Sequence, residues 1–376
     1  MSFTSLGLSA TIVKALEAQN YVDPYPIQEK AIPAVLSRKD VLGIAKTGSG
    51  KTASYVLPVL MHTQKSSVSK NRHVKVLVLV PTRELAVQVS EVFKDFASAL
   101  PNRIKTMAVF GGVSINPQMI ALQGVEILVA TPGRLLELVD SNAVHLSDID
   151  TLVLDEADKM LNLGFKEEMN RIFSHLPKKR QNLLFSATLS DDLSNFKQVL
   201  LNDPVVISIK QKVDELELIE QTAYAVPQAK KGPLLRHLIQ SKKLKQVLVF
   251  TSSVYEAEKV VTKLFKHGIQ ATAIHGKKSQ NARTENLRKF KTGKLRVLVT
   301  TDLLARGIDI EFLPYVINYD LPRSPKDFVH RIGRTGRAES PGEAISFVTP
   351  EEMPHFRVIQ KKMGKWVDMI DAENIL

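Results

Sequence analysis

The stretch Ala45-Lys46-Thr47-Gly48-Ser49-Gly50-Lys51-Thr52 decides the fold of the first half of the chain. It follows the apolar run 41–44, which favours a short strand, and precedes residues 53–57, which can continue as a helix. A strand, a glycine loop and Gly-Lys-Thr at a helix start form a phosphate-binding arrangement. The first position departs from the general pattern, because Ala45 stands where glycine is usual.

The residue types of this loop suit a triphosphate. Glycines have no Cβ, so the amides near Gly48 and Gly50 can approach an anion closely, and the helix N-terminus adds a positive dipole end. Lys51 can reach the β- and γ-phosphates, and Thr52 can hold Mg²⁺. The competing interpretation is a glycine-rich turn with a solvated lysine.

Composition limits the class of protein. The 376 residues are too many for one ordinary core and natural for two domains. No apolar run approaches the roughly 20 residues of a membrane helix, and the N-terminus resembles no secretory signal. Cysteine is absent, which fits a reducing compartment. We therefore expect a soluble, cytoplasmic protein that does not bind membranes.

Charge is distributed unevenly along the chain. Residues 1–210 hold 23 Lys and Arg against 20 Asp and Glu, whereas residues 211–376 hold 28 against 19. The second half therefore supplies a net +9 of the total +12. Such an excess suggests a polyanionic partner such as nucleic acid, although a merely soluble basic surface would give the same count.

Apolar runs that end on polar, glycine or proline residues alternate with helical stretches. This alternation predicts doubly wound parallel sheets with ligands beyond the carboxyl ends of the strands. The predicted domains are 1–207 and 221–376, joined by an acidic linker at 208–220. The predicted strands are 41–44, 74–80, 106–110, 125–130, 151–154 and 182–185, followed by 246–250, 271–275, 296–300, 315–319 and 344–348.

The tetrapeptide Asp155-Glu156-Ala157-Asp158 follows the strand predicted at 151–154. At a strand end, Asp155 can be aimed at Mg²⁺ while Glu156 positions and deprotonates an attacking water. A lone acidic turn is usually only solvated, but its place after an apolar strand and downstream of the phosphate loop favours the catalytic interpretation.

The stretch His330-Arg331-Ile332-Gly333-Arg334-Thr335-Gly336-Arg337 concentrates arginine and glycine. Arg334 and Arg337 lie three residues apart and could point the same way on a helical turn. Guanidinium groups suit the charge of a transferring phosphoryl group. Taken alone, the stretch fits a nucleic-acid patch as well as an arginine finger.

Two further residues stand out. The prolines of Asp23-Pro24-Tyr25-Pro26-Ile27-Gln28 favour an extended turn that can hold the Gln28 amide still. An amide has the donor and the acceptor that read an adenine edge, although Gln28 alone could equally be a helix-start residue.

Trp366 is the only tryptophan, and we interpret it as helix packing rather than as a base-stacking platform.

Together these motifs resemble the DEAD-box ATP-dependent RNA helicases of superfamily 2 over nearly the whole chain. The resemblance implies two tandem RecA-like α/β domains joined by a short linker. The remaining matches are the adenine-reading segment 24–28 with Phe3, motifs Ia at 81–86, Ib at 131–134 and III at 186–188, a loose motif IV at 249–252, Gln280 with Arg283, motif V at 301–302 and 306–309, and motif VI at 330–337.

The resemblance also implies a role for each matching residue. ATP would be bound by Phe3, Gln28, Ala45, Lys46, Thr47, Gly48, Ser49, Gly50, Lys51, Thr52, Gly307 and Asp309. The catalytic residues would be Lys51, Asp155, Glu156, Arg334 and Arg337, with Mg²⁺ held by Thr52 and Asp155, partly through water. RNA would meet Pro81, Thr82, Arg83, Gly112, Thr131, Arg134, Gln280, Arg283 and Thr301. Asp158, Ser186, Thr188 and His330 would couple the two sites.

The implied activity is ATP-dependent and local. ATP and RNA would close the domains, the groove would separate a short duplex, and hydrolysis would reset it. Backbone contacts would make recognition largely independent of sequence. We expect a monomer with unknown protein partners. An ATP-gated RNA clamp that does not unwind RNA would have the same motifs, and release of one strand from a short duplex distinguishes the clamp from a helicase. A DNA helicase of the same superfamily is a third alternative, which competition with a 2′-deoxy substrate tests.

Overall fold

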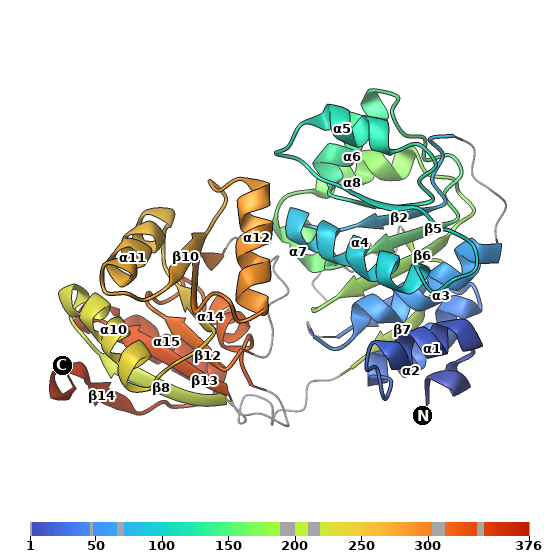
Figure 1. The fold of residues 1–376 in the computed structure, drawn as a ribbon. Coiled ribbons are helices and arrows are strands. Elements are labelled where there is room, and N and C mark those ends of the chain that lie inside the picture. The colour runs from blue at the N-terminus through green and yellow to red at the C-terminus, as the bar shows by residue number, and fades with distance from the viewer. Residues whose placement is uncertain are drawn as a thin grey trace. The chain divides into compact units, whose positions relative to one another are not determined.

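The computed structural model describes residues 2–45, 48–65, 71–188, 200–209, 219–302, 313–336 and 342–375. The chain divides into two compact units, Met1–Gln211 and Lys212–Leu376, which are coloured from blue to green and from yellow to red in Figure 1. Most of the predicted linker lies outside the described residues, so its bounds stay a prediction. Within the described residues, no helix is both long enough and apolar enough to span a bilayer.

The first unit is built on a parallel seven-stranded sheet in the order β3-β4-β2-β5-β6-β1-β7. Strand β1 pairs with β6 on one side and β7 on the other, and β6 pairs with β5. The carboxyl ends of β1, β6 and β5 are therefore neighbours. The strands are β1 Val41–Ile44, β2 Val76–Leu79, β3 Thr106–Val109, β4 Ile127–Ala130, β5 Thr151–Leu154, β6 Gln181–Ser186 and β7 Val205–Ser208.

Both faces of this sheet are buried, as continuous apolar strands require. Because side chains alternate along a strand, Val76 and Val78 join the core beneath α1 to α4, whereas Leu77 and Leu79 join the core beneath α6 to α8. The helices are η1 Phe3–Leu6, α1 Ala10–Ala18, α2 Pro26–Leu36, α3 Lys51–Lys65, α4 Arg83–Ala97, α5 Ile115–Ala121, α6 Pro132–Asp140, α7 Ala157–Asn162 and α8 Lys166–Ser174.

The second unit repeats the architecture with the strand order β10-β11-β9-β12-β13-β8-β14. All of its strand pairs are parallel. The strands are β8 Ile219–Ala225, β9 Val247–Phe250, β10 Ala271–Ile274, β11 Val297–Thr300, β12 Tyr315–Asn318, β13 Gly342–Val348 and β14 Met369–Asp371.

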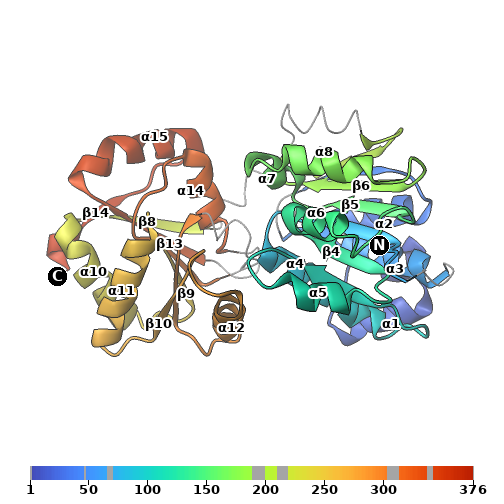
Figure 2. The same cartoon turned by 90° about the horizontal axis from the view of Figure 1, so that it is seen from above.

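Helices cover both faces of the second sheet as well. One core lies beneath α10 and α11. The opposite face has two cores, one beneath α12 over β9 to β12 and one beneath α14 and α15 over β8 and β13. In Figure 2, α12 and α15 accordingly lie at different ends of this unit. The helices are η3 Gln228–Lys230, α10 Lys231–Ser241, α11 Val254–Lys266, α12 Gln280–Lys291, α14 Pro325–Ile332, η4 Pro350–Glu352, α15 Met353–Met363 and η5 Ala372–Asn374.

All of the predicted strands are present, with ends that differ by at most two residues. Three strands were missed. β7 and β14 are edge strands, and only one residue of β7 and none of β14 is fully buried, so neither shows a continuous apolar run. β8 begins at Ile219, inside the range expected for the linker, because its polar residues mask the apolar alternation.

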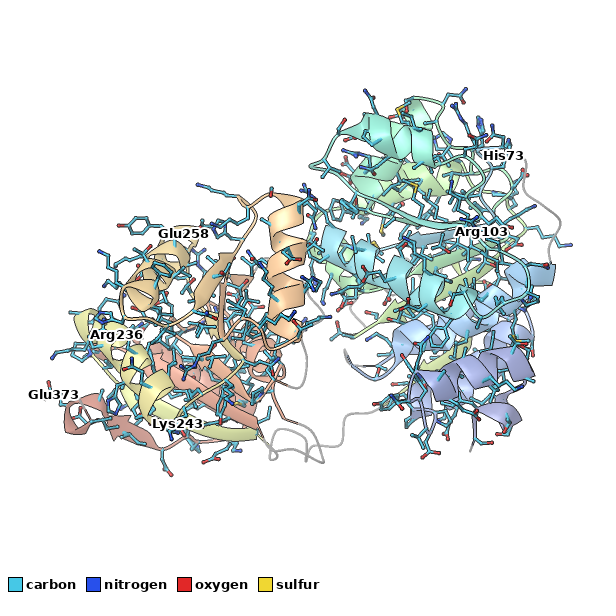
Figure 3. All side chains as sticks on the ribbon, viewed as in Figure 1. His73, Arg103, Arg236, Lys243, Glu258 and Glu373 are labelled. Carbon is cyan, nitrogen blue, oxygen red and sulfur yellow. The ribbon has the colours of Figure 1, made fainter. Side chains whose placement is uncertain are left out.

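Buried and half-buried charges fix the loops of the second unit. Glu258 of α11, labelled in Figure 3, accepts from His275 Nε2 at 2.7 Å and pairs with Lys278 Nζ at 2.6 Å. On α10, the Lys231 side chain is fully buried, and its Nζ lies 3.2 Å from both Asp320 Oδ1 and Glu352 Oε2. Lys231 thus neutralises two acidic groups that follow β12 and β13.

The substitution Lys231→Met should destabilise the second unit strongly. It leaves Asp320, which is 6% exposed, without its charged partner, and breaking a buried pair from one side costs about 3 kcal/mol or more. Chemical denaturation measures this loss in the free energy of unfolding. Lys230→Met, at the exposed neighbouring position, is the matched control, and equal effects of the two changes would contradict the assignment.

Candidate active site

The phosphate loop connects β1 to α3, which begins at Lys51 as the sequence predicts. Gly48 and Gly50 adopt φ values of 73° and 84°, a region that residues with a Cβ rarely occupy. Ala45 is 2% exposed and closes the core behind the loop. Ser49 lies between the two glycines, while Lys46 and Thr47 lie outside the described residues.

Lys51 is held at the base of this loop. Its Nζ donates to Ala45 O at 2.6 Å, and the residue is 6% exposed. Burial lowers the pKa of Lys51, while the nearby carboxylates of Asp155 and Glu156 act in the opposite direction. The structure therefore places the Lys51 ammonium group of the phosphate loop near the acidic residues Asp155 and Glu156.

Gln28 connects the proline-rich turn to the phosphate loop. Its Oε1 accepts from Tyr25 N at 2.8 Å, and its Nε2 donates to Gly50 O at 3.2 Å. A Cβ on Gly50 would lie 2.5 Å from Gln28 Nε2, so glycine is required for this approach. The prediction that the amide is held still is confirmed, although both of its ends contact protein here.

Asp155 lies at the carboxyl end of β5 and is 2% exposed. Its Oδ1 accepts from Glu156 N at 2.9 Å, and its Oδ2 accepts from the Tyr55 hydroxyl at 2.8 Å. Burial raises the pKa of Asp155 and raises the pKa of Tyr55 well above its ordinary value. Sequence reasoning missed Tyr55, because an apolar helix position gave no sign of its contact with a strand end.

Glu156 has an unusual backbone. Its φ of 53° and ψ of 46° are left-handed, a conformation that costs a residue with a Cβ about 1 kcal/mol and that clusters at functional sites. Its Oε1 lies 2.6 Å from Lys159 Nζ. Its Oε2 is buried and has no hydrogen-bond partner among the described residues. Burial raises the pKa of Glu156.

The last residue of the acidic tetrapeptide contacts the end of β6. Asp158 Oδ2 accepts from Thr188 Oγ1 at 3.1 Å, and its Oδ1 accepts from Ala187 N at 3.4 Å. Ser186 Oγ in turn donates to Thr188 O at 2.8 Å. The structure therefore joins three of the predicted coupling residues within the first unit, while His330 belongs to the second.

The predicted RNA contacts of the first unit lie at the ends of β2, β3 and β4. Thr82 caps α4, and the Arg83 guanidinium packs so closely on Gly112 that a Cβ there would clash with it. Arg134 is 6% exposed, and it donates to Glu137 Oε2 at 2.7 Å and Val113 O at 2.8 Å. Arg134 thus holds the loop after β3 in this structure. Pro81 and Thr131 are buried beside these residues.

The second unit has a buried arginine that sequence reasoning left without a role. Arg331 lies 2.5 and 2.7 Å from the two carboxylate oxygens of Asp302, and it donates to Asn318 Oδ1 and Asp320 O. It also stacks 4.8 Å from the Phe250 ring. The sequence shows only that Arg331 lies among glycines and further arginines. Its contact with Asp302, which connects motif VI to motif V, could not be predicted from that pattern.

The remaining predicted residues of the second unit vary in exposure. Gln280 and Arg283 start α12, are 6% and 4% exposed, and hydrogen-bond to each other. Arg334 is 8% exposed, Thr301 is half-buried and His330 is exposed. Gly307, Asp309 and Arg337 lie outside the described residues, so their predicted roles stay predictions.

Phe3 packs in the core of the first unit. It is 4% exposed and meets Tyr21 edge-on at a ring separation of 6.5 Å. The expectation that its ring stacks on adenine therefore stays a prediction.

The residues present fit Mg²⁺ bound together with a phosphate. Thr52 and Asp155 supply hydroxyl and carboxylate oxygens, the donors that Mg²⁺ prefers. Among the described residues, no three His, Asp or Glu side chains gather into a metal cage. One carboxylate with phosphate oxygens is the usual arrangement for Mg²⁺ at nucleotide sites.

Comparisons with known proteins agree with this geometry. Residues 25–196 match the DEAD/DEAH box helicase model, and residues 230–339 match the helicase conserved C-terminal domain. The chain is 40% identical to the DEAD-box ATP-dependent RNA helicase CshA of Geobacillus kaustophilus over 96% of this chain and 76% of the relative. It is 41% identical to CshA of Streptococcus pneumoniae over 97% of this chain and 69% of that protein.

Solved structures share the fold. Dbp5 of S. cerevisiae bound to RNA and ADP BeF3 matches with a TM-score of 0.84 and 30% identity, covering 98% of this chain and 95% of that one. A DEAD box protein from Methanococcus jannaschii matches with a TM-score of 0.55 and 35% identity, covering 98% and 99%. The RecA-like fold is thereby confirmed, and the chain belongs to the family of DEAD-box ATP-dependent RNA helicases.

Proposed function

We propose that this protein hydrolyses ATP in response to RNA and uses the cycle to separate short RNA duplexes. The observation that carries the proposal is the meeting of three motifs at adjacent strand ends. Lys51 follows β1, Asp155 and Glu156 follow β5, and Thr188 follows β6 in contact with Asp158. Neighbouring carboxyl ends of a parallel sheet are where such folds bind and process nucleotides.

The first unit would bind ATP and prepare the attack. Backbone amides around Gly48 and Gly50 would cradle the phosphates, and the Lys51 ammonium would balance their charge. Mg²⁺, held by Thr52 and Asp155, would neutralise charge on the phosphates. Glu156 Oε2, which accepts no hydrogen bond from the described residues, would take the proton of the attacking water.

Tyr55 would keep the metal-facing carboxylate in one orientation. Its hydroxyl donates to Asp155 at 2.8 Å, and the Thr52 side chain is close enough to influence the pKa of Tyr55. One phenol thus lies close to both residues that would hold Mg²⁺. Groups that orient metal ligands in this way set metal affinity and activity.

RNA would complete the site through the second unit. Arg334 and Arg337 would stabilise the transferring phosphoryl group once ATP and RNA bring the units together. The Asp158–Thr188 hydrogen bond would transmit movements caused by nucleotide binding or hydrolysis to the segment at the end of β6. Contacts with sugars and phosphates would make RNA binding largely sequence-independent. The cytoplasmic location and the monomeric state stay predictions.

The substitution Glu156→Gln should abolish ATP turnover while nucleotide and RNA binding persist. The amide keeps the shape of the side chain but cannot accept the proton. Steady-state hydrolysis and fluorescent-nucleotide binding measure the two effects, with the exposed Glu167→Gln as the control. Lys51→Ala should lose turnover and weaken nucleotide binding. If the Glu156→Gln variant hydrolysed ATP at the wild-type rate, Glu156 would not be the general base.

The substitution Tyr55→Phe should lower the free energy of unfolding by about 1–3 kcal/mol, because a buried carboxylate oxygen loses its donor. It should also weaken Mg²⁺-dependent nucleotide binding by about 10-fold. Denaturation and nucleotide titrations with and without Mg²⁺ measure these effects. Tyr25→Phe, which removes a hydroxyl from a residue that is 45% exposed, should change stability by less than about 0.5 kcal/mol.

A fragment of residues 1–211 should bind nucleotide and show almost no RNA-stimulated turnover. In the full chain, Arg334→Ala or Arg337→Ala should cut stimulated hydrolysis by about 10³ or more. Hydrolysis rates at saturating RNA test this, with unfolding curves as the control for damage to the second unit. Release of a labelled strand from a short duplex distinguishes unwinding from clamping. Full stimulation of the fragment would show that the first unit is complete by itself.

A further inference from the structure

Helix α15 exposes a stripe of basic side chains. Arg357, Val358, Lys361 and Lys362 recur at spacings of three and four residues and are all exposed, whereas Phe356 and Ile359 pack into the core. The helix holds no aspartate or glutamate. Its outer face is therefore positive from Arg357 to its C-terminal end.

Trp366 follows this helix and faces solvent. Gly364 ends α15 with a φ of 73°, and Val367 returns to the core at 9% exposure, yet Trp366 between them is 70% exposed. The sequence-based interpretation of Trp366 as a packing residue is therefore wrong. A large exposed indole beside a basic helix needs another explanation.

A depression of about 370 Å³ adjoins the stripe. It lies between α14 and α15 and is lined by Ser324, Pro325, Lys326, Val329 and Lys362. Within the described residues, neither lysine forms an ion pair, and the same holds for Arg357 and Lys361. We call Lys326, Arg357, Lys361, Lys362 and Trp366 the α14–α15 surface.

Helix stability alone does not account for this surface. Lys361 and Lys362 lie in the last turn of α15, where a cation is favoured by the helix dipole. Lys326, however, lies in the first turn of α14, where the dipole disfavours it. Arg357 lies mid-helix, and Trp366 lies beyond the helix end. Acidic residues flank these elements in the sequence, with Asp327 after Lys326, Glu351 and Glu352 before α15 and Asp368 after Trp366. Within the described part of the chain, the basic residues of the surface form no ion pair with them.

We propose that the α14–α15 surface is a second contact site for single-stranded RNA. The basic side chains would contact phosphates, and the Trp366 indole would stack on a base, which is how proteins bind single strands without reading sequence. The surface is separate from Gln280 and Arg283, which belong to α12 at the other end of the sheet (Figure 2). The site requires neither ATP hydrolysis nor closure of the two units.

The chemistry favours RNA over an acidic polypeptide. An acidic polypeptide would match the lysines but gives no reason for an exposed indole, whereas every RNA base offers a face that stacks on it. A strand that reaches both this surface and the predicted groove gains affinity because its second contact is intramolecular. Longer single strands should therefore bind more tightly than strands that fill one site.

The fluorescence of Trp366 reports on this surface directly, because it is the only tryptophan of the chain. Titration of the full chain with a single-stranded 20-mer, without nucleotide, should quench the emission as bases stack on the indole. The neutralised variant Lys361→Gln/Lys362→Gln should bind more weakly. Its slope of log affinity against log salt should be smaller by about 1.4, since each lost phosphate contact removes about 0.7 for a single strand.

A matched control exists on α11. Lys263→Gln/Lys266→Gln removes the same charge from the last turn of a helix, next to Phe265, which is 75% exposed. Helix α11 differs from α15 because it also contains Glu256 and Glu258. The control should keep the quenching, the salt slope and the RNA-stimulated hydrolysis of the wild type.

Three outcomes would overturn the proposal. Emission that does not change with RNA would show that no base reaches Trp366. Equal losses in the two double variants would show that only net charge matters. Equal quenching by poly-glutamate at the same charge concentration would show that the surface binds polyanions, proteins included, without base stacking. Thermal unfolding of each variant verifies that the fold is intact.

Discussion

A parallel strand that is buried on both faces can present polar side chains only at its ends. This constraint organises the first unit, in which the four residues of β2 and of β5 are all buried. The chain therefore gathers its reactive groups in the segments that follow β1, β5 and β6. Because these strands are neighbours in the sheet, residues 51, 155 and 188 meet although more than one hundred positions separate the first from the others.

Bringing these groups together has an electrostatic cost, and the structure offsets it locally. Lys51, Asp155 and Glu156 are nearly excluded from water, so burial opposes the charged form of each. The opposite charges of the cluster attract one another, and the Tyr55 hydroxyl and Lys159 contact the two carboxylates. These interactions offset part of the free energy that is lost when the charges leave water. The left-handed backbone at Glu156 adds strain at the same point. Such a site is arranged to stabilise the charge of a bound ligand or transition state, at a cost to the folding stability of the unit.

The sequence predicted the elements that share one strong signal and missed those that depend on tertiary partners. Continuous apolar strands and the glycine loop were visible because each is a local pattern. The edge strands β7 and β14 have few buried residues, so no local pattern marks them. Tyr55 and Arg331 read as ordinary helix residues because their partners, Asp155 and Asp302, are distant in the sequence. Motif matching located Arg134 and Arg283 but could not foresee that both are buried.

The two units use charge in different ways, and this difference bears on how they cooperate. The first is nearly neutral, and its important charges are buried around the phosphate loop. The second has most of the excess positive charge; it buries Arg331 and Lys231 against carboxylates but leaves the basic residues of α15 exposed. Buried pairs fix loop geometry, whereas exposed cations attract a polyanion over distances set by salt. In the proposed mechanism, the buried charges of the first unit would hold ATP in a fixed geometry, while the exposed cations of the second unit would attract the RNA strand.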